Sequence, residues 1–242
     1  MSTVYYSGYA AEMDNFTVID PEPLLKSVTK EWKGKDAFFL LKCPAMTNEM
    51  KNTFVIRAPF DITVSWDDEK GFHFTNKAFK NLGQGGFDNF FKLVPNEKSD
   101  LMLTINQIFT GYGNYLFFAD EPTTLQLQPA NYHKTKISKF PFIAGSYEID
   151  KWCRPIILAI INDKKEDIVI KRNDPLYYVK FYSKKDVVLK RFEITREIEQ
   201  IVVGSLTIKK YLQGYSMRRL YDMFMQSGNK KRILKAIRQQ HE

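Results

Sequence analysis

Apolar residues recur at every second position through much of the first 190 or so residues, which is the pattern of half-buried β-strands. Between residues 53 and 66 this alternation predicts two short strands that pivot at Pro59, followed by a turn over residues 67–71. Further short strands are predicted over residues 101–109, 115–119, 125–127, 140–149, 155–161, 167–170 and 176–181. Glycine, proline, asparagine and aspartate separate these runs. We therefore predict a mainly β fold, arranged as a sandwich or a barrel.

The pattern changes to a helical one after Glu193. Residues 196–202, 216–226 and 230–240 suit helices, and Leu220 with Phe224 and Ile233 with Ile237 are apolar pairs four positions apart. The sequence Ser-Gly-Asn at 227–229 is typical of a helix end followed by a turn. We predict a β-rich domain over residues 1–192 and a helical C-terminal extension over 193–242, packed on that domain or projecting from it.

The composition is that of a globular chain, with 44% hydrophobic and 14% aromatic residues. No apolar run reaches the roughly 18 residues of a membrane helix, and the first residues resemble no secretion signal, so we expect a cytoplasmic protein that does not enter membranes. Cys43 and Cys153 show no metal-type or redox-type spacing, and we expect both to be ordinary buried thiols.

The net charge of +8 is concentrated at the C-terminal end. Residues 209–242 contain nine basic and two acidic residues, and nine minus two leaves +7, so the rest of the chain carries only +1. A solvated helix face, an acidic partner protein and nucleic acid all remain open as explanations. Apolar residues interleave these charges and aromatic ones are few, which favours a protein over single-stranded nucleic acid. The candidate binding residues here are Arg218, Arg219, Lys230, Lys231, Arg232, Lys235 and Arg238.

Complete catalytic and metal-binding motifs are absent from the sequence. His73, His133 and His241 are not followed by the His-x-Asp or His-x-Glu pattern of iron oxygenases, so we predict no metal site. There is no Gly-x-Ser-x-Gly nucleophile motif. The glycine cluster at residues 83–86 lacks the Lys-Ser/Thr of a P-loop, and we interpret it as a flexible loop. No cofactor is predicted.

Residues 143–182, IAGSYEIDKWCRPIILAIINDKKEDIVIKRNDPLYYVKFY, resemble in layout the last conserved stretch of the dUTPase and dCTP deaminase superfamily. That resemblance implies a β-clip-like barrel, a homo-oligomer such as a trimer, and a water-orienting carboxylate at Asp150. Asn162 and Asp174 fall in the two later turns of the family pattern. Cys153 stands where the family has the tyrosine that stacks on deoxyribose, Pro155 replaces a glycine, and the Arg-Ser-Ser phosphate motif is missing.

Arg154 is the remaining candidate in this stretch, because it follows Trp152 at a predicted strand start. Its guanidinium could pair with Asp174 or Asp150 as a structural clamp. Alternatively, Arg154 and Asp150 line a ligand pocket, as the β-clip resemblance implies.

The strings NTFVIRAPFD, FADEP, GSYEIDKWCRP and IKRNDPLYYVKF look like an uncharacterised family of bacteriophages and some bacteria. This resemblance implies a viral protein, located in the host cytoplasm or the virion. We therefore predict a non-enzymatic module that binds an acidic host or virion protein through its basic C-terminal helices. The alternatives are a diverged nucleotide enzyme that uses Asp150 and a nucleic-acid-binding accessory protein.

Overall fold

The fold is described from a computed structural model of residues 1–8, 19–69, 71–75, 91–94, 104–108, 115–141, 144–156, 160–161, 166–212 and 214–241. The strands are β1 (Ser2–Gly8), β2 (Glu22–Pro23), β3 (Thr53–Arg57), β4 (Ile62–Asp67), β5 (Gly71–Phe74), β6 (Phe91–Val94), β7 (Thr104–Ile108), β8 (Tyr115–Ala119), β9 (Thr124–Pro129), β10 (Ser146–Glu148), β11 (Ile160–Ile161), β12 (Ile168–Ile170), β13 (Pro175–Tyr182) and β14 (Val187–Arg191). The helices are α1 (Leu24–Trp32), α2 (Pro44–Met50), α4 (Arg196–Tyr211), α5 (Met217–Gln226) and α6 (Asn229–Arg238), with 3-10 helices η2 (Asp36–Lys42) and η4 (Lys136–Lys139).

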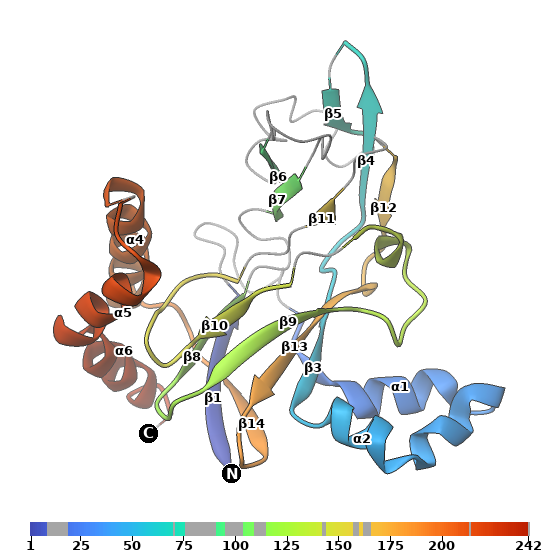
Figure 1. Ribbon diagram of the computed structural model, residues 1–242, viewed down its shortest axis with the longest axis horizontal. Helices are drawn as coiled ribbons and strands as arrows, with labels where there is room; N and C mark the ends of the chain where they lie inside the picture. The colour runs from blue at the N-terminus through green and yellow to red at the C-terminus, as the bar shows by residue number, and fades with distance from the viewer. Residues whose placement is uncertain are drawn as a thin grey trace.

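Two sheets form the centre of the molecule (Figure 1). One has the strand order β14-β1-β8, in which β1 is parallel to β14 and antiparallel to β8. The other has the order β10-β9-β13-β3-β2, and its pairs are antiparallel. Smaller sheets, β12-β4-β5 and β11-β7-β6, continue from them. Side chains from both central sheets, among them Val4, Phe117, Leu127 and Phe181, share one buried cluster.

Strand β8 separates two hydrophobic cores because successive side chains of a strand point to opposite faces. Tyr115 and Phe117 belong to the core between the sheets. Leu116 and Phe118 belong to a second core, which they share with the C-terminal helices. The buried residues that α4, α5 and α6 contribute to this second core include Ile198, Val202, Leu220, Phe224, Ile233 and Ile237. The C-terminal helices therefore pack on the sheet instead of projecting from it.

The five-stranded sheet is covered by the N-terminal helices in the same way. Tyr177 and Val179 of β13 face the central core, whereas Tyr178 faces a third cluster with Leu24, Val28 and other residues of α1 and α2. In Figure 1 these blue helices lie on the side of the molecule opposite to the red C-terminal helices.

The structure corrects the predicted fold class, because helices and strands occupy similar shares of the described residues and the fold is a mixed α/β one. The N-terminal helices were missed. Helix α1 follows Pro23 with no side-chain cap and has no acidic residue in its first turn, and η2 buries none of its residues. The start signal of α1 is consequently weak, although its apolar residues Leu24 and Val28 recur at helical spacing.

Several predicted elements are confirmed. The alternation over residues 53–66 corresponds to β3 and β4, and the turn after Asp67 joins β4 to β5 as an antiparallel hairpin. The three C-terminal helices form, and Gly228, at φ 74°, makes the left-handed turn between the last two. None of the described helices is both long enough and apolar enough to cross a membrane. The glycine cluster at 83–86 and Asn162 lie outside the described residues.

Candidate protein-binding site

The C-terminal helices begin at residues that fix their ends. The Thr195 hydroxyl accepts a hydrogen bond from the Ile198 amide at the start of α4, at 3.3 Å. Ser216 does the same for the Arg219 amide at the start of α5, also at 3.3 Å. Each hydroxyl satisfies an amide that has no partner within its helix. These caps fix the residues at which α4 and α5 begin.

A groove lies between α4, α5 and the start of α6, with a volume of about 300 Å³. Most of its lining is apolar, and Ile201, Leu220 and Phe224 are the buried residues that α4 and α5 share with the sheet below. Its lining consists of Trp152, Gln200, Ile201, Gly204, Ser205, Ile208, Leu220, Met223, Phe224, Ser227, Asn229 and Arg232. The apolar stripe of the helices is therefore wider than the part that the sheet covers.

Exposed apolar side chains are frequent on α4 and α5, and two of them, Ile208 and Met223, line this groove. Among the described residues, eleven large hydrophobic side chains are exposed, and six of them lie between residues 203 and 225. These six are Val203, Leu206, Ile208, Tyr211, Met223 and Met225. Tyr211 is the most exposed of them, at 77%. A concentration of apolar surface in one place is typical of a binding site, whereas scattered single residues are not.

Three of the predicted basic residues are engaged within the molecule. Lys230 donates to the Asp120 carbonyl at 2.7 Å, and Arg238 pairs with the Asp120 carboxylate at 2.7 Å. Arg232 pairs through Nε with Glu197 on α4, at 2.9 Å. The first two contacts hold α6 against the end of β8, and the third joins α6 to α4.

The remaining basic residues face solvent. The Arg219 guanidinium lies 4.0 Å from the centre of the Tyr215 ring. Arg218, Lys231 and Lys235 are exposed and form no ion pair with any residue that the structure describes. Free positive charge is thus left on the exposed surface of α5 and α6, where Lys231 and Lys235 line a separate pocket with Asp120.

Asp150, the predicted catalytic candidate, is 4% exposed and accepts a hydrogen bond from the Thr123 amide at 3.2 Å. Its other oxygen lies 4.0 Å from Nζ of Lys230, the residue that follows the first position of α6. The structure therefore brings together two predicted site residues, Asp150 and Lys230, in a contact between a loop and the C-terminal helix.

Arg154 and Asp174 do not meet each other. Arg154 lies 4.8 Å from the centre of the Tyr147 ring, and within the described residues it pairs with neither Asp150 nor Asp174. Its Nε and the Nε1 of Trp152 are buried and have no hydrogen-bond partner in the part of the chain that the structure describes. Asp174 accepts from the Lys171 amide at 2.8 Å and shapes the turn before β13. The clamp predicted between Arg154 and these carboxylates is therefore not formed.

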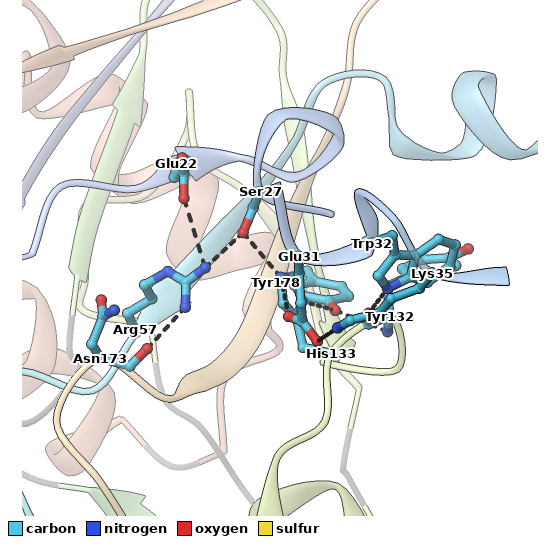
Figure 2. A network of polar contacts seen from close by, with 10 residues as sticks. All are labelled: Glu22, Ser27, Glu31, Trp32, Lys35, Arg57, Tyr132, His133, Asn173 and Tyr178. Atoms are coloured by element: carbon cyan, nitrogen blue, oxygen red, sulfur yellow. Dashed lines mark hydrogen bonds and ion pairs between the residues drawn. The ribbon is translucent and has the colours of Figure 1, made fainter. Parts of the chain in front are cut away.

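His133 lies in a second polar cluster, on the opposite side of the sheets from the C-terminal helices (Figure 2). Its Nε2 is 2.9 Å from the Ser27 hydroxyl on α1, and its Nδ1 is 2.7 Å from the Tyr178 hydroxyl on β13. Burial lowers the pKa of His133, and the Glu31 carboxylate opposes this shift. The imidazole is thus held neutral between a helix and a strand.

Arg57 extends this cluster along β3, as Figure 2 shows. Its guanidinium donates to the Ser27 hydroxyl at 2.6 Å and to the Asn173 carbonyl at 2.8 Å, and it lies 3.6 Å from Glu22. Ser27 is 3% exposed and His133 is 6% exposed, so this serine–histidine contact is closed to a substrate. The cluster fastens α1 to the sheet, and His133 has a structural role in it.

The two cysteines differ in their exposure to solvent. Cys153 is buried as predicted, but Cys43 is exposed because it lies between η2 and α2 at the surface. Within the described part of the chain, no three His, Cys, Asp or Glu side chains come together as ligands for a metal ion.

The groove was not predicted from the sequence. Gly204 in the middle of a helical pattern was the available signal, because glycine is a poor helix former. Ile208 and Tyr211 follow it at spacings that place all three on one helix face.

Known proteins give no assignment for this site. No family model matches the chain, and no curated protein matches it significantly. The resemblances to the β-clip fold and to a phage family therefore stay predictions.

Proposed function

We propose that this protein is a non-enzymatic protein-binding module and that its C-terminal helices α4, α5 and α6 are the recognition element. One observation carries the proposal: the helices bury one apolar face on the sheet and leave a second apolar surface, the groove, open with Arg232 in its lining. Protein interfaces combine an apolar centre with a polar, charged rim in this way.

The side chains at the groove suit a protein partner. Met223, which lines the groove, is unbranched and flexible, and methionine adapts to irregular partner surfaces. Tyr211 offers a large exposed ring, and tyrosine is enriched where binding energy is concentrated. The phage resemblance makes an acidic host or virion protein the expected partner.

The enzymatic alternative has less support. A water-orienting carboxylate needs access to substrate, whereas both oxygens of Asp150 face groups of the protein, the Thr123 amide and Lys230. A binding role needs no such access, and it uses the surface that the chain leaves uncovered.

A capture experiment with three baits tests this function. The wild-type protein, a Gly204→Leu variant and a Lys42→Gln variant are each immobilised and exposed to nuclease-treated lysate of a bacterial host. Gly204→Leu places a side chain in the groove, because Gly204 is one of the lining residues and nothing lies within 4 Å of a Cβ added there. Lys42→Gln is the control, since Lys42 is an exposed charge at the end of η2, on the side of the molecule opposite to the groove.

We expect a specific protein to be retained by the wild type and by Lys42→Gln and to be lost with Gly204→Leu. Equal retention by all three baits would place any binding elsewhere on the molecule. Retention seen only in a parallel capture without nuclease, and weakening steeply with salt, would favour the nucleic-acid alternative.

A further inference from the structure

We propose that the groove binds an amphipathic helix with acidic side chains, contributed by the partner, and that this helix crosses α4 at Gly204 with a carboxylate at Arg232. This inference rests on the proposed function and specifies the chemistry of the partner. Three features of the groove support it: an open glycine, an arginine whose two terminal nitrogens are free, and a small volume whose lining includes exposed apolar residues.

Gly204 is the first feature. It lies in the middle of the 16-residue helix α4, where glycine costs about 0.5–1 kcal/mol relative to alanine. The fold of the protein does not require glycine at position 204, because an added Cβ would meet nothing within 4 Å and the φ angle of Gly204 is not positive. The missing side chain opens the groove from outside. A glycine at a helix surface lets a second backbone approach closely, which a helical partner would use.

The charge at one end of the groove is the second feature. Arg232 is the charged residue of the lining, and its contact with Glu197 uses only Nε. Its two terminal nitrogens form no hydrogen bond with any described residue, so they remain able to hold a carboxylate with two parallel bonds.

Helix α6 adds to this positive end. Its first turn contains no acidic residue, and the helix dipole places partial positive charge there. Asn229, the first residue of α6, lines the groove. An acidic partner therefore fits this end better than a neutral or basic one.

The small size of the groove and the exposure of its apolar residues are the third feature. Its volume of about 300 Å³ accommodates only a few side chains, at the lower limit of small-molecule pockets. Two of its apolar lining residues, Ile208 and Met223, are 40% and 37% exposed, and Tyr211, farther along α4, is 77% exposed. A partner helix that inserts some side chains and covers the rest would bury both parts, as in helix-in-groove recognition.

The test uses three synthetic peptides of about 18 residues, long enough for five helical turns. The first has leucines at helical spacing and glutamates beside them; the second has the same leucines with lysines in place of the glutamates. The third keeps the glutamates and replaces the leucines with glutamine. Binding to the full-length protein is measured by fluorescence anisotropy of labelled peptides.

We expect the first peptide to bind and the other two to bind at least about tenfold more weakly. Gly204→Leu should weaken the first peptide about tenfold or more by filling the crossing point. Arg232→Gln should weaken it as well, with a smaller effect when the peptide's glutamates are themselves replaced by glutamine. Lys42→Gln removes the same charge far from the groove and should change nothing.

Several results would overturn the inference. Equal binding of the lysine peptide would exclude the acidic partner, and unchanged binding to Gly204→Leu would exclude the groove. If no peptide binds while the lysate protein is still captured by the wild type and lost with Gly204→Leu, the partner is not an acidic helix but the binding function stands. If that capture also fails, the proposed function itself is wrong.

Discussion

Buried polar side chains connect the helices of this protein to its sheets. His133 and Arg57 join α1 to β13 and β3 through the shared Ser27 hydroxyl. Asp150 joins the segment after β10 to α6 through Lys230. At each point the partners are distant in the sequence, and a buried group that loses its partner is costly, typically about 1–3 kcal/mol. These contacts therefore determine where the helices lie on the sheets.

We predict that folding stability falls as the pH is lowered because His133 must take up a proton. Its pKa is lowered in the folded protein, so the folded state favours the neutral imidazole. The full contribution is present above the unfolded pKa of about 6.5 and is lost as the pH falls through the lower folded pKa. Glu31 faces the ring and reduces the effect, whereas Arg57 adds to it.

Urea unfolding of the wild type and His133→Gln at several pH values measures this contribution. The difference in free energy of unfolding between the two proteins should shrink from about pH 7 to about pH 5. His241→Gln, at an exposed position near the C-terminus, should leave the pH dependence of the wild type in place. If the difference in free energy of unfolding between the wild type and His133→Gln does not change with pH, His133 is not the source of the pH dependence.

At the scale of elements, the C-terminal helices have well-defined ends but an unusual interior. Hydroxyl caps begin α4 and α5, and Gly228 adopts the left-handed conformation that ends α5 and starts α6. Gly204 has no such conformational reason. Gly204 and Gly228 thus serve different purposes, the second for a turn and the first for open space.

We predict opposite effects of alanine at these two glycines. Gly204→Ala should raise the free energy of unfolding by about 0.5–1 kcal/mol, because alanine favours a helix and its methyl group meets nothing. Gly228→Ala should lower it by about 1 kcal/mol, because φ is 74° there. Urea denaturation checks both, and a destabilised Gly204→Ala protein would show that the space at this position is already filled.

At the scale of the whole molecule, two sheets lie between two groups of helices, and the C-terminal group is part of the fold. Leu116, Phe118, Trp152 and Cys153 are buried in the core that this group completes. The predicted extension at 193–242 is thus packed tightly against the β-rich part of the chain. Single surface substitutions are consequently better tests of binding than removal of the helices.

We predict that a chain ending after residue 213 loses its native packing. It lacks α5 and α6, so Phe118, Trp152 and Cys153 lose the side chains that cover them. In the full-length protein only the exposed Cys43 should react rapidly with a thiol reagent, and in the shortened chain Cys153 should react as well. Association in solution should increase too. A shortened chain that stays monomeric with Cys153 protected would contradict this.

Local periodicity was sufficient for much of the secondary structure. Strands such as β8 and β13 and the helices α5 and α6 were predicted because their apolar residues repeat at the period of the element. The helices α1 and α2 and the strands β1 and β14 were not predicted, and β1 pairs with a strand at the other end of the chain. The strands are stabilised by pairing with each other and the helices by packing against the sheet. The intrinsic propensities of their residues contribute less.

The sequence by itself determined the alternating strands, the amphipathic C-terminal helices and the concentration of positive charge near the end of the chain. Only the tertiary structure decided which of those charges are free. Lys230 contacts Asp120 and Asp150, and Arg238 pairs with Asp120, and both aspartates are distant from these residues in the sequence. It also decided that the helices leave a groove open at Gly204. Periodicity reports which residues avoid water, but the surface that covers them is set by contacts between distant segments.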